Sequence, residues 1–431
     1  MESIEELPTS TTTRKSSSSD TCSTESVSPS DKKGASVKRR FSDSDSSVSN
    51  TYKLTSENST NAESSEQRVG SESANSITEI PAKTSDWSEH HFPHLQIETA
   101  PEVFSPYVIF SSFSDFLENQ KNKRSEIHAI YSKPSFKRQL YLQYCSYLVE
   151  SVIDLDYDHV DHVPVNRVHD VFCKTKNFEK SHLRDWFRNH VTGRTKKNLS
   201  KDEVEMRTEL KERCASICDR SNQLLSQLQY MVNKRQASKP EELSEGMYQE
   251  LFIRFAKIFG LEIMGDPNVG RFTFQIAGRD ITSIPDALIL NPSHKGFTNS
   301  VLAVVKVKKS YSREEDAESA RQLQGLQKKP RFSQHIDYRL KGQHVGQLMS
   351  VLPHSVFGSS GIYGFIVQAT EVTVVAFAAE EKYLEYLRKG NLPKIMSATV
   401  KYSEKCNILS KKGRLDLVNT LFDMAALMEY L

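Results

Sequence analysis

The sequence of 431 residues predicts an α/β fold for the C-terminal half, in which a mixed β-sheet is flanked by helices. Two apolar runs of strand length, 284–290 and 301–307, are separated by a turn-rich stretch. Segments with the apolar spacing of amphipathic helices precede and follow these runs. Residues 1–88 instead contain mostly Ser, Thr, Asn and scattered charge, so they offer little apolar surface to bury. We therefore predict a disordered N-terminal tail followed by a folded part.

Three segments lie between the tail and the predicted sheet. Residues 89–134 are rich in Pro, Ser and aromatic residues without a clear period, which predicts an irregular connector. Apolar spacings near three and four then predict three short helices that form an all-α unit over 135–200. The charged stretch 201–239 is expected to be a connecting helix. A dimerising coiled coil is the alternative, but fewer than the roughly three or four heptads that it needs are visible.

The predicted sheet belongs to a C-terminal domain over 240–431. Pro240 opens a helix that ends at Gly260, and three strands follow it, at 271–276, 284–290 and 301–307. A second helix stops at Pro353, after which two more strands and two helices complete the chain. The last two of the first three strands are expected to form a central hairpin. This order of elements implies a mixed sheet covered by helices.

Composition excludes several classes of protein. The six cysteines show no C-x-x-C spacing, which indicates reduced thiols rather than a disulfide framework. The chain has no apolar run of about 18 residues, and its acidic N-terminus lacks the apolar stretch of a signal peptide. No membrane partner is therefore expected. Basic clusters at 32–33, 38–40 and 194–197 favour the nucleus over the cytosol.

Two lysines at the end of the run 301–307 are candidates for a functional site. Side chains alternate along a strand, so Lys306 and Lys308 point to the same side and Lys309 to the other. Burying an unpaired ammonium is costly, so either the strand reaches the surface at Lys306 or a carboxylate neutralises it. Asp286 would lie close by if the two strands pair. A carboxylate and a lysine at the end of a sheet could hold a divalent cation with a water or phosphate, as metal-dependent phosphodiester hydrolysis requires.

Pro285-Asp286 followed by Lys306-Val307-Lys308 at the end of an apolar strand resembles the PD-(D/E)XK nuclease-like superfamily, which has the restriction-endonuclease-like fold. The resemblance covers about 241–382. It implies that Asp286 binds the metal ion and that Lys308 positions the attacking water. It also implies that Glu250 and Gln347 assist from the flanking helices. Lys306, however, stands where the superfamily has its second metal-binding acid.

The positive charge of Lys306 is expected to weaken the binding of Mg²⁺ severely, unless Asp280 or Glu250 compensates. Two lysines facing a groove still suit a polyanion. We therefore expect this domain to be an inactive nuclease-like domain that needs no cofactor. The alternative is a metal-dependent DNA endonuclease of the PD-(D/E)XK type, with Mg²⁺ held by Asp286.

The stretch 172–189 resembles helices two and three of a homeodomain. Trp186 and Phe187 fall where that family buries its core, and Asn189 falls on the asparagine that pairs with adenine in the major groove. Val191 departs from the pattern, because an arginine normally contacts phosphate there. A generic helical domain is the alternative. The DNA-binding residues that the resemblance and the adjoining basic run predict are Arg184, Asp185, Arg188, Asn189, Thr192, Arg194, Lys196 and Lys197.

The two resemblances together predict a nuclear, DNA-binding regulatory protein that contacts double-stranded DNA and possible protein partners. The acidic and histidine-rich loop 154–162 is not expected to bind a metal ion. It lacks the Gly and the terminal Glu of a calcium loop, and it lacks the Cys/His spacing of zinc sites.

Overall fold

The computed structural model describes residues 79–121, 136–177, 201–291, 300–309 and 336–430. All of them belong to one compact unit, Gln67–Leu431. The third predicted helix of the all-α unit, near 179–191, lies outside the described residues. None of the described helices is long and apolar enough to span a membrane.

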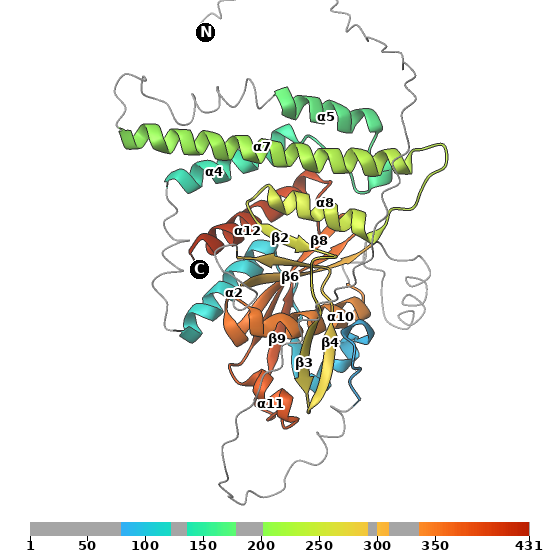
Figure 1. The fold of residues 1–431 in the computed structure, drawn as a ribbon, viewed down its shortest axis with the longest axis vertical. Helices are drawn as coiled ribbons and strands as arrows, with labels where there is room; N and C mark the ends of the chain where they lie inside the picture. The colour runs from blue at the N-terminus through green and yellow to red at the C-terminus, as the bar shows by residue number, and fades with distance from the viewer. Residues whose placement is uncertain (1–78, 122–135, 178–200, 292–299, 310–335, 431) are drawn as a thin grey trace, which may run out of the picture. The chain divides into compact units, whose positions relative to one another are not determined.

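The central element is a mixed sheet, as predicted (Figure 1). Its strands are β1 (Ile97–Thr99), β2 (Glu262–Gly265), β5 (Ala287–Leu290), β6 (Val301–Lys308), β7 (Gly361–Gln368), β8 (Glu371–Ala379), β9 (Ala398–Tyr402) and β10 (Cys406–Asn407). They lie in the order β1-β9-β8-β7-β6-β5-β2, and β10 pairs with β8 outside this order. The pairs β6–β7 and β1–β9 are parallel, whereas the other pairs are antiparallel.

The pairing of β5 with β6 determines where the candidate site lies. The two strands are antiparallel, as expected of a central hairpin, and Ala287 lies opposite Val305. Asp286 directly precedes Ala287, so it comes level with Lys306 at the end of β6. Val305 and Val307 belong to the core on one face of the sheet, so Lys306 between them points to the opposite face.

Helices cover the first face of the sheet in two tiers (Figure 1). They are α2 (Pro106–Lys121), α4 (Phe136–Tyr147), α5 (Val165–Asn177), α7 (Lys201–Arg235), α8 (Glu245–Lys257) and α12 (Lys411–Tyr430). A single hydrophobic core contains side chains from all six helices and from β6, β7 and β8. The described helices of the predicted all-α unit, α4 and α5, therefore share the core of the sheet instead of closing one of their own.

The second face of the sheet carries a smaller set of elements. They are α10 (Tyr338–Val351), α11 (Tyr383–Lys389) and a separate hairpin of β3 (Phe272–Ile276) with β4 (Arg279–Ser283). The strand predicted at 271–276 is therefore β3, which lies in this hairpin and not in the central sheet. A second hydrophobic core lies between these elements and the sheet. Ile276 and Arg279 close the hairpin through Ala277 and Gly278, both at positive φ.

Ordered structure begins earlier than the sequence analysis predicted. Residues 80–99, which we call the N-terminal strap, pack on α10 and the β3–β4 hairpin, and Trp87 in the strap is 1% exposed. Glycines make room for it: a Cβ on Gly342 would lie 2.2 Å from the Ser88 backbone, and one on Gly346 would lie 2.8 Å from Thr84. The predicted boundary of the tail at 88 is therefore wrong. The predicted irregular connector, 89–134, likewise contains β1 and α2.

Arg414 joins α12 to the segment that follows α4. Its side chain is 1% exposed, and all its N–H-bearing nitrogens donate hydrogen bonds to backbone oxygens. The acceptors are the carbonyls of Val149, Ile153, Leu155, Ile408 and Leu409. Burial lowers the pKa of the guanidinium to about 10. A buried cation without a hydrogen-bonded carboxylate thus satisfies the backbone where two irregular segments meet.

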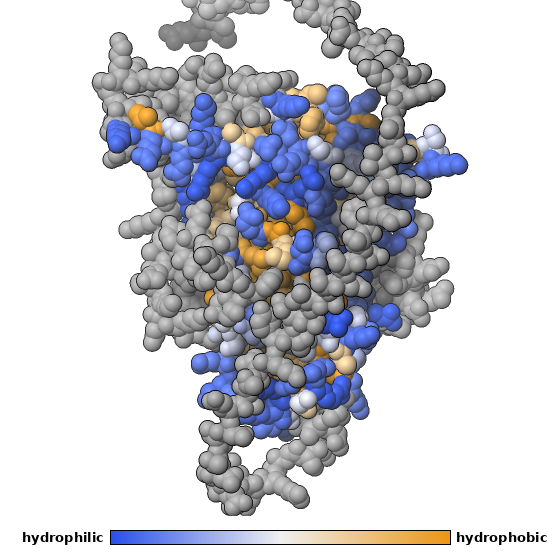
Figure 2. All heavy atoms as spheres, viewed as in Figure 1, coloured by the Kyte–Doolittle hydropathy of each residue, from blue (hydrophilic) through white to orange (hydrophobic). Residues whose placement is uncertain are grey.

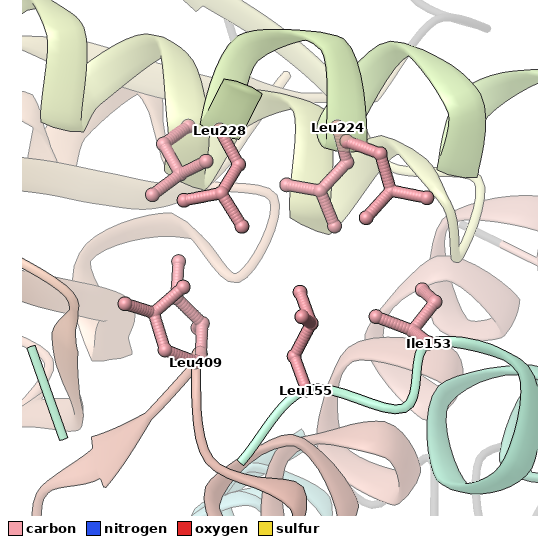
Figure 3. A pocket seen from close by; sticks show the side chains of 8 residues that line it. Ile153, Leu155, Leu224, Leu228 and Leu409 are labelled. Carbon is pink, nitrogen blue, oxygen red and sulfur yellow. The ribbon is translucent and has the colours of Figure 1, made fainter. Parts of the chain in front are cut away.

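A small apolar cavity lies beside these segments, under α7 (Figure 3). Its lining residues are Ile153, Leu155, Leu224, Leu225, Leu228, Leu251, Ile408 and Leu409. Because all eight side chains are aliphatic, this cavity offers no group for acid–base chemistry or metal binding. On the face seen in Figure 2, hydrophilic residues cover much of the described surface, with apolar residues showing between them in several places, including the middle of the view.

Candidate functional site

The candidate site is centred on an ion pair between neighbouring strands. Lys306 Nζ donates a hydrogen bond to Asp286 Oδ1 at 3.1 Å, and the two side chains are 12% and 23% exposed. The other carboxylate oxygen, Oδ2, accepts from the Val307 backbone N–H at 2.6 Å. Both carboxylate oxygens of Asp286 are therefore engaged by β6. The structure brings together two of the predicted site residues, Asp286 and Lys306, in direct contact.

Lys308 lies one pleat further along the same face, as predicted, but it has a different partner. Its Nζ donates to Glu245 Oε1, at the start of α8, at 3.2 Å, and both side chains are more than two-fifths exposed. Lys309, on the other face, pairs with Glu242 at 2.7 Å. Each of the three lysines at the end of β6 thus has a carboxylate partner. The positive charge of this edge is balanced locally.

The backbone around Asp286 is fixed from α8 and β2. Gln249 Nε2 donates to the Asp286 carbonyl at 2.9 Å, and the Asp266 N–H donates to the same oxygen at 3.1 Å. Gly265 leaves room for this contact, because a Cβ there would lie 2.6 Å from Gln249 Nε2. The position of Asp286 therefore depends on α8 and on the turn after β2 as well as on β6.

The helix α10 contributes two buried polar residues on the Lys306 side. Gln347 Nε2 donates to the Ile284 carbonyl at 2.9 Å, two residues before Asp286. Gln347 thus supports the segment that leads to the acid. It makes no hydrogen bond to the Asp286 carboxylate. Its Oε1 is buried without a hydrogen-bond partner among the described residues.

His344 lies one turn before Leu348 on α10 and is fully buried. Its Nε2 lies 3.3 Å from the Val304 carbonyl, which requires the proton on Nε2 and leaves Nδ1 without a partner among the described residues. Burial, with a smaller contribution from the nearby Lys306 charge, lowers the pKa of His344 to about 3. The ring is therefore neutral near pH 7 and cannot serve as a second cation at the site.

Two expected helpers lie elsewhere. Glu250 pairs with Arg254 on its own helix at 2.7 Å, and Arg254 also donates to the Gln223 carbonyl of α7. Asp280 accepts from Gln275 across the β3–β4 hairpin at 3.0 Å. Neither carboxylate contacts Asp286 or Lys306. The expectation that Glu250 contributes from the flanking helix is thus not met by its contacts.

The helix residues that do reach this edge are Glu245 and Gln249. They are four positions apart, so they lie on one face of α8, one turn from each other. In the sequence, the i, i+4 spacing of Glu245 and Gln249 is the signal that could have identified them as the α8 residues facing the ends of β5 and β6. Glu250 is the next residue along the helix and is rotated by about 100° from Gln249, which follows from 3.6 residues per turn.

The residues present do not fit the Mg²⁺ ion that the sequence resemblance implies. Mg²⁺ takes near-octahedral oxygen ligands at roughly 2.0–2.1 Å. Here a single carboxylate is held by a backbone N–H and by an ammonium, which competes for the same oxygen and would repel the ion. Among the residues that the structure describes, no three His, Cys, Asp or Glu side chains are placed to hold a metal ion.

The acidic loop at 154–162 has structural contacts. Asp161 pairs with Arg235 at the end of α7 at 2.5 Å, and the Asp156 carboxylate accepts from the backbone N–H of Lys411. Asp158 and His162 form an exposed pair at 2.6 Å, which raises the pKa of His162. These contacts fasten the loop to α7 and to the start of α12.

The predicted DNA-binding residues all fall within 178–200 and lie outside the described residues. Comparisons with known proteins add no assignment for them or for the rest of the chain. No family model, curated protein or solved structure matches this sequence or this fold.

Proposed function

We propose that the chain is a nuclear DNA-binding regulatory protein whose C-terminal part has the restriction-endonuclease-like fold but does not cleave nucleic acid. The fold part of this proposal is supported by the order of elements on which the sequence resemblance rests. Helix α8 is followed by β2, by the separate β3–β4 hairpin and then by β5 and β6. In the central sheet β2, β5 and β6 pair antiparallel, and β7, which comes after α10, is parallel to β6. The motif residues lie where β5 and β6 meet.

One observation carries the absence of catalysis: the ammonium of Lys306 lies 3.1 Å from Asp286 Oδ1. Metal-assisted hydrolysis needs an ion that polarises the phosphodiester and activates water. A lysine ammonium carries half the charge of such an ion and offers no open coordination position. The site therefore lacks the group on which the chemistry of this class depends.

The DNA-binding part rests on the sequence around Asn189. A helix that presents Arg188 and Asn189, followed by the basic run 194–197, suits a major groove flanked by phosphates. In this proposal the nuclease-like part serves for contacts with nucleic acid or with other proteins. Nuclear localisation belongs to the same proposal, with the basic clusters at 32–33 and 38–40 as its signals.

Catalysis is tested with the purified full-length chain, supercoiled plasmid and single-stranded DNA, in Mg²⁺ or Mn²⁺. We expect the DNA to stay intact at protein concentrations that saturate binding. Metal-dependent cleavage that disappears in Asp286→Ala would overturn the proposal in favour of an endonuclease. Cleavage that persists in Asp286→Ala would indicate a contaminating nuclease, and repurification of both proteins would decide the case.

DNA binding is tested by fluorescence anisotropy with duplex DNA at a defined salt concentration. Removing the adenine contact in Asn189→Ala should weaken specific binding by about 1–3 kcal/mol. Asn198→Ala, which lies beyond the predicted helix, is the matched control and should bind like the wild type. Unchanged binding in both Arg188→Ala and Asn189→Ala would contradict the homeodomain-like role.

A further inference from the structure

The carboxylate of Asp286 is held in place without help from Lys306. The backbone carbonyl oxygen of Asp286 accepts hydrogen bonds from Gln249 Nε2 at 2.9 Å and from the Asp266 N–H at 3.1 Å. The side-chain Oδ2 accepts from the Val307 N–H at 2.6 Å. These three contacts come from α8, from the residue after β2 and from β6. Among the described residues, Oδ2 thus has a backbone donor, and the cationic partner of the carboxylate contacts Oδ1.

We infer that Lys306 is a resident cation that closes a latent divalent-metal site at Asp286. The ammonium occupies the position beside Oδ1 where a metal ion would bind, and it is itself only 12% exposed. A carboxylate that is only 23% exposed is stabilised by a positive partner, and the Lys306 side chain supplies one permanently. The choice of a divalent ion as the displaced partner rests on the nuclease-like comparison made for the proposed function.

The lysines further along β6 do not provide this partner. Lys308 is paired with Glu245 and Lys309 with Glu242, and these ion pairs are much more exposed than the Lys306–Asp286 pair. Lys306 is thus the described cation in contact with Asp286. Exchanging it for an acid would place two carboxylates side by side across β5 and β6, with Oδ1 of Asp286 free. Hard oxygen donors of this kind suit Mg²⁺ and Mn²⁺.

The test measures Mn²⁺ binding to the full-length chain by isothermal titration calorimetry and by the loss of the free-ion EPR signal. Lys306→Glu is compared with the wild type, with Lys306→Glu/Asp286→Asn and with Lys308→Glu. The last variant is the matched control, because it makes the same charge change on the same face of the same strand. We expect Lys306→Glu to bind one Mn²⁺ at least tenfold more tightly than the wild type and Lys308→Glu. Asp286→Asn should abolish that gain.

Two results would overturn the inference. One is a folded Lys306→Glu protein, judged by circular dichroism, that binds Mn²⁺ no better than Lys308→Glu. The other is a wild-type protein that already binds Mn²⁺ through Asp286. If Lys306→Glu does not fold, Lys306→Gln decides: it frees Oδ1 without adding charge, and its Mn²⁺ affinity must exceed that of the wild type and fall in Lys306→Gln/Asp286→Asn.

The assay contains no nucleic acid, so its outcome is independent of DNA binding. A chain that fails to bind DNA would refute the proposed function while leaving the resident-cation inference open to support by the Mn²⁺ titrations. A chain that binds DNA, but whose Lys306→Glu variant gains no metal affinity, would refute the inference alone.

Discussion

Lys306 and Asp286 lie across from each other at the end of the β5–β6 ladder, with Nζ 3.1 Å from Oδ1. The residue between the two lysines contributes as well, because the Val307 N–H donates to Oδ2 at 2.6 Å. A backbone N–H and a side-chain ammonium of β6 thus both donate hydrogen bonds to the Asp286 carboxylate. The arrangement extends the pairing of the two strands beyond their last backbone partners.

The ion pair predicts an asymmetric effect on stability. Lys306→Met leaves the largely buried Asp286 carboxylate without its cation, and we expect a loss of about 1–3 kcal/mol in the free energy of unfolding. Lys308→Met is the matched control, since its exposed pair with Glu245 should contribute less than about 1 kcal/mol. Urea denaturation measures both. Equal effects of the two substitutions would contradict the importance given to burial.

The resident cation also predicts how nucleic-acid binding responds to metal ions. Since Lys306 already neutralises Asp286, we expect the duplex affinity of the wild type to be the same, within about twofold, in EDTA and in Ca²⁺ at matched ionic strength. Lys306→Gln leaves Asp286 uncompensated, so Ca²⁺ should strengthen its binding relative to EDTA. Fluorescence anisotropy titrations measure the duplex affinity of the wild type and of Lys306→Gln, each in EDTA and in Ca²⁺. A wild-type affinity that depends strongly on Ca²⁺ would argue against Lys306 as the substitute for a metal.

His344 predicts a dependence of stability on pH. Burial lowers its pKa in the folded protein to about 3, whereas the unfolded chain titrates near the model-peptide value of about 6.5. Between these two pH values the imidazole is protonated in the unfolded state but not in the folded state. The free energy of unfolding therefore falls by up to about 1.4 kcal/mol per pH unit as the pH drops below about 6.

The matching measurement compares urea denaturation of the wild type and of His344→Gln between pH 7 and pH 4. The variant should lose less stability over this range. His354, whose pKa burial also lowers, is present in both proteins, so the difference isolates His344. Parallel pH profiles for the two proteins would show that His344 does not titrate as proposed.

The contacts of Arg414 predict that even a substitution that keeps the positive charge lowers the free energy of unfolding strongly. A lysine has three donors on one atom and cannot reach five carbonyls that a planar guanidinium satisfies. We expect Arg414→Lys to lower the free energy of unfolding by at least about 3 kcal/mol, because buried carbonyls lose their donors. Lys412→Ala, on the exposed side of the same helix, should change it by less than about 0.5 kcal/mol. Thermal or urea denaturation distinguishes the two.

The N-terminal strap is tested at the glycine beneath it. A Cβ on Gly342 would lie 2.2–2.4 Å from the Ser88 backbone, so Gly342→Ala should push the strap off α10. In a Trp186→Phe background, Trp87 is the remaining tryptophan, and its emission should shift to longer wavelength. Gly270→Ala, where a Cβ meets no atom within 4 Å, is the control. An unshifted Trp87 spectrum in Gly342→Ala would contradict this packing.

The apolar periodicity was sufficient to predict the long elements of the sheet. The runs at 284–290 and 301–307 pair as expected, and the strands at 361–368 and 371–379 follow. Among the short strands, β3 was predicted at 271–276, whereas β2 and β9 were not. β2 and β9 have only four and five residues and are set by pairing with distant partners. Local sequence does not encode such pairing strongly, since the stability of a short strand comes from its neighbours.

The candidate site was predicted in part. Alternation along β6 placed Lys306 and Lys308 on one face, and pairing with β5 brought Asp286 to Lys306. Glu250 was chosen by motif order, but the rotation of α8 directs Glu245 and Gln249 to the strand ends instead. Which helical face meets a strand depends on tertiary packing, here on the apolar side of α8 that enters the core.

The pairing of β1 with β9 has a consequence for synthesis of the chain. Ile97 lies beside Ala398, so the first described strand has no partner in the sheet until residues 398–400, about 300 positions later, have been synthesised. Contacts of such wide sequence separation delay folding, because loop-closure entropy is lost before they form. The strap can dock on the β3–β4 hairpin and α10 once these are made, but β1 has to wait for β9, so closure of this edge of the sheet is expected to be a late step of folding.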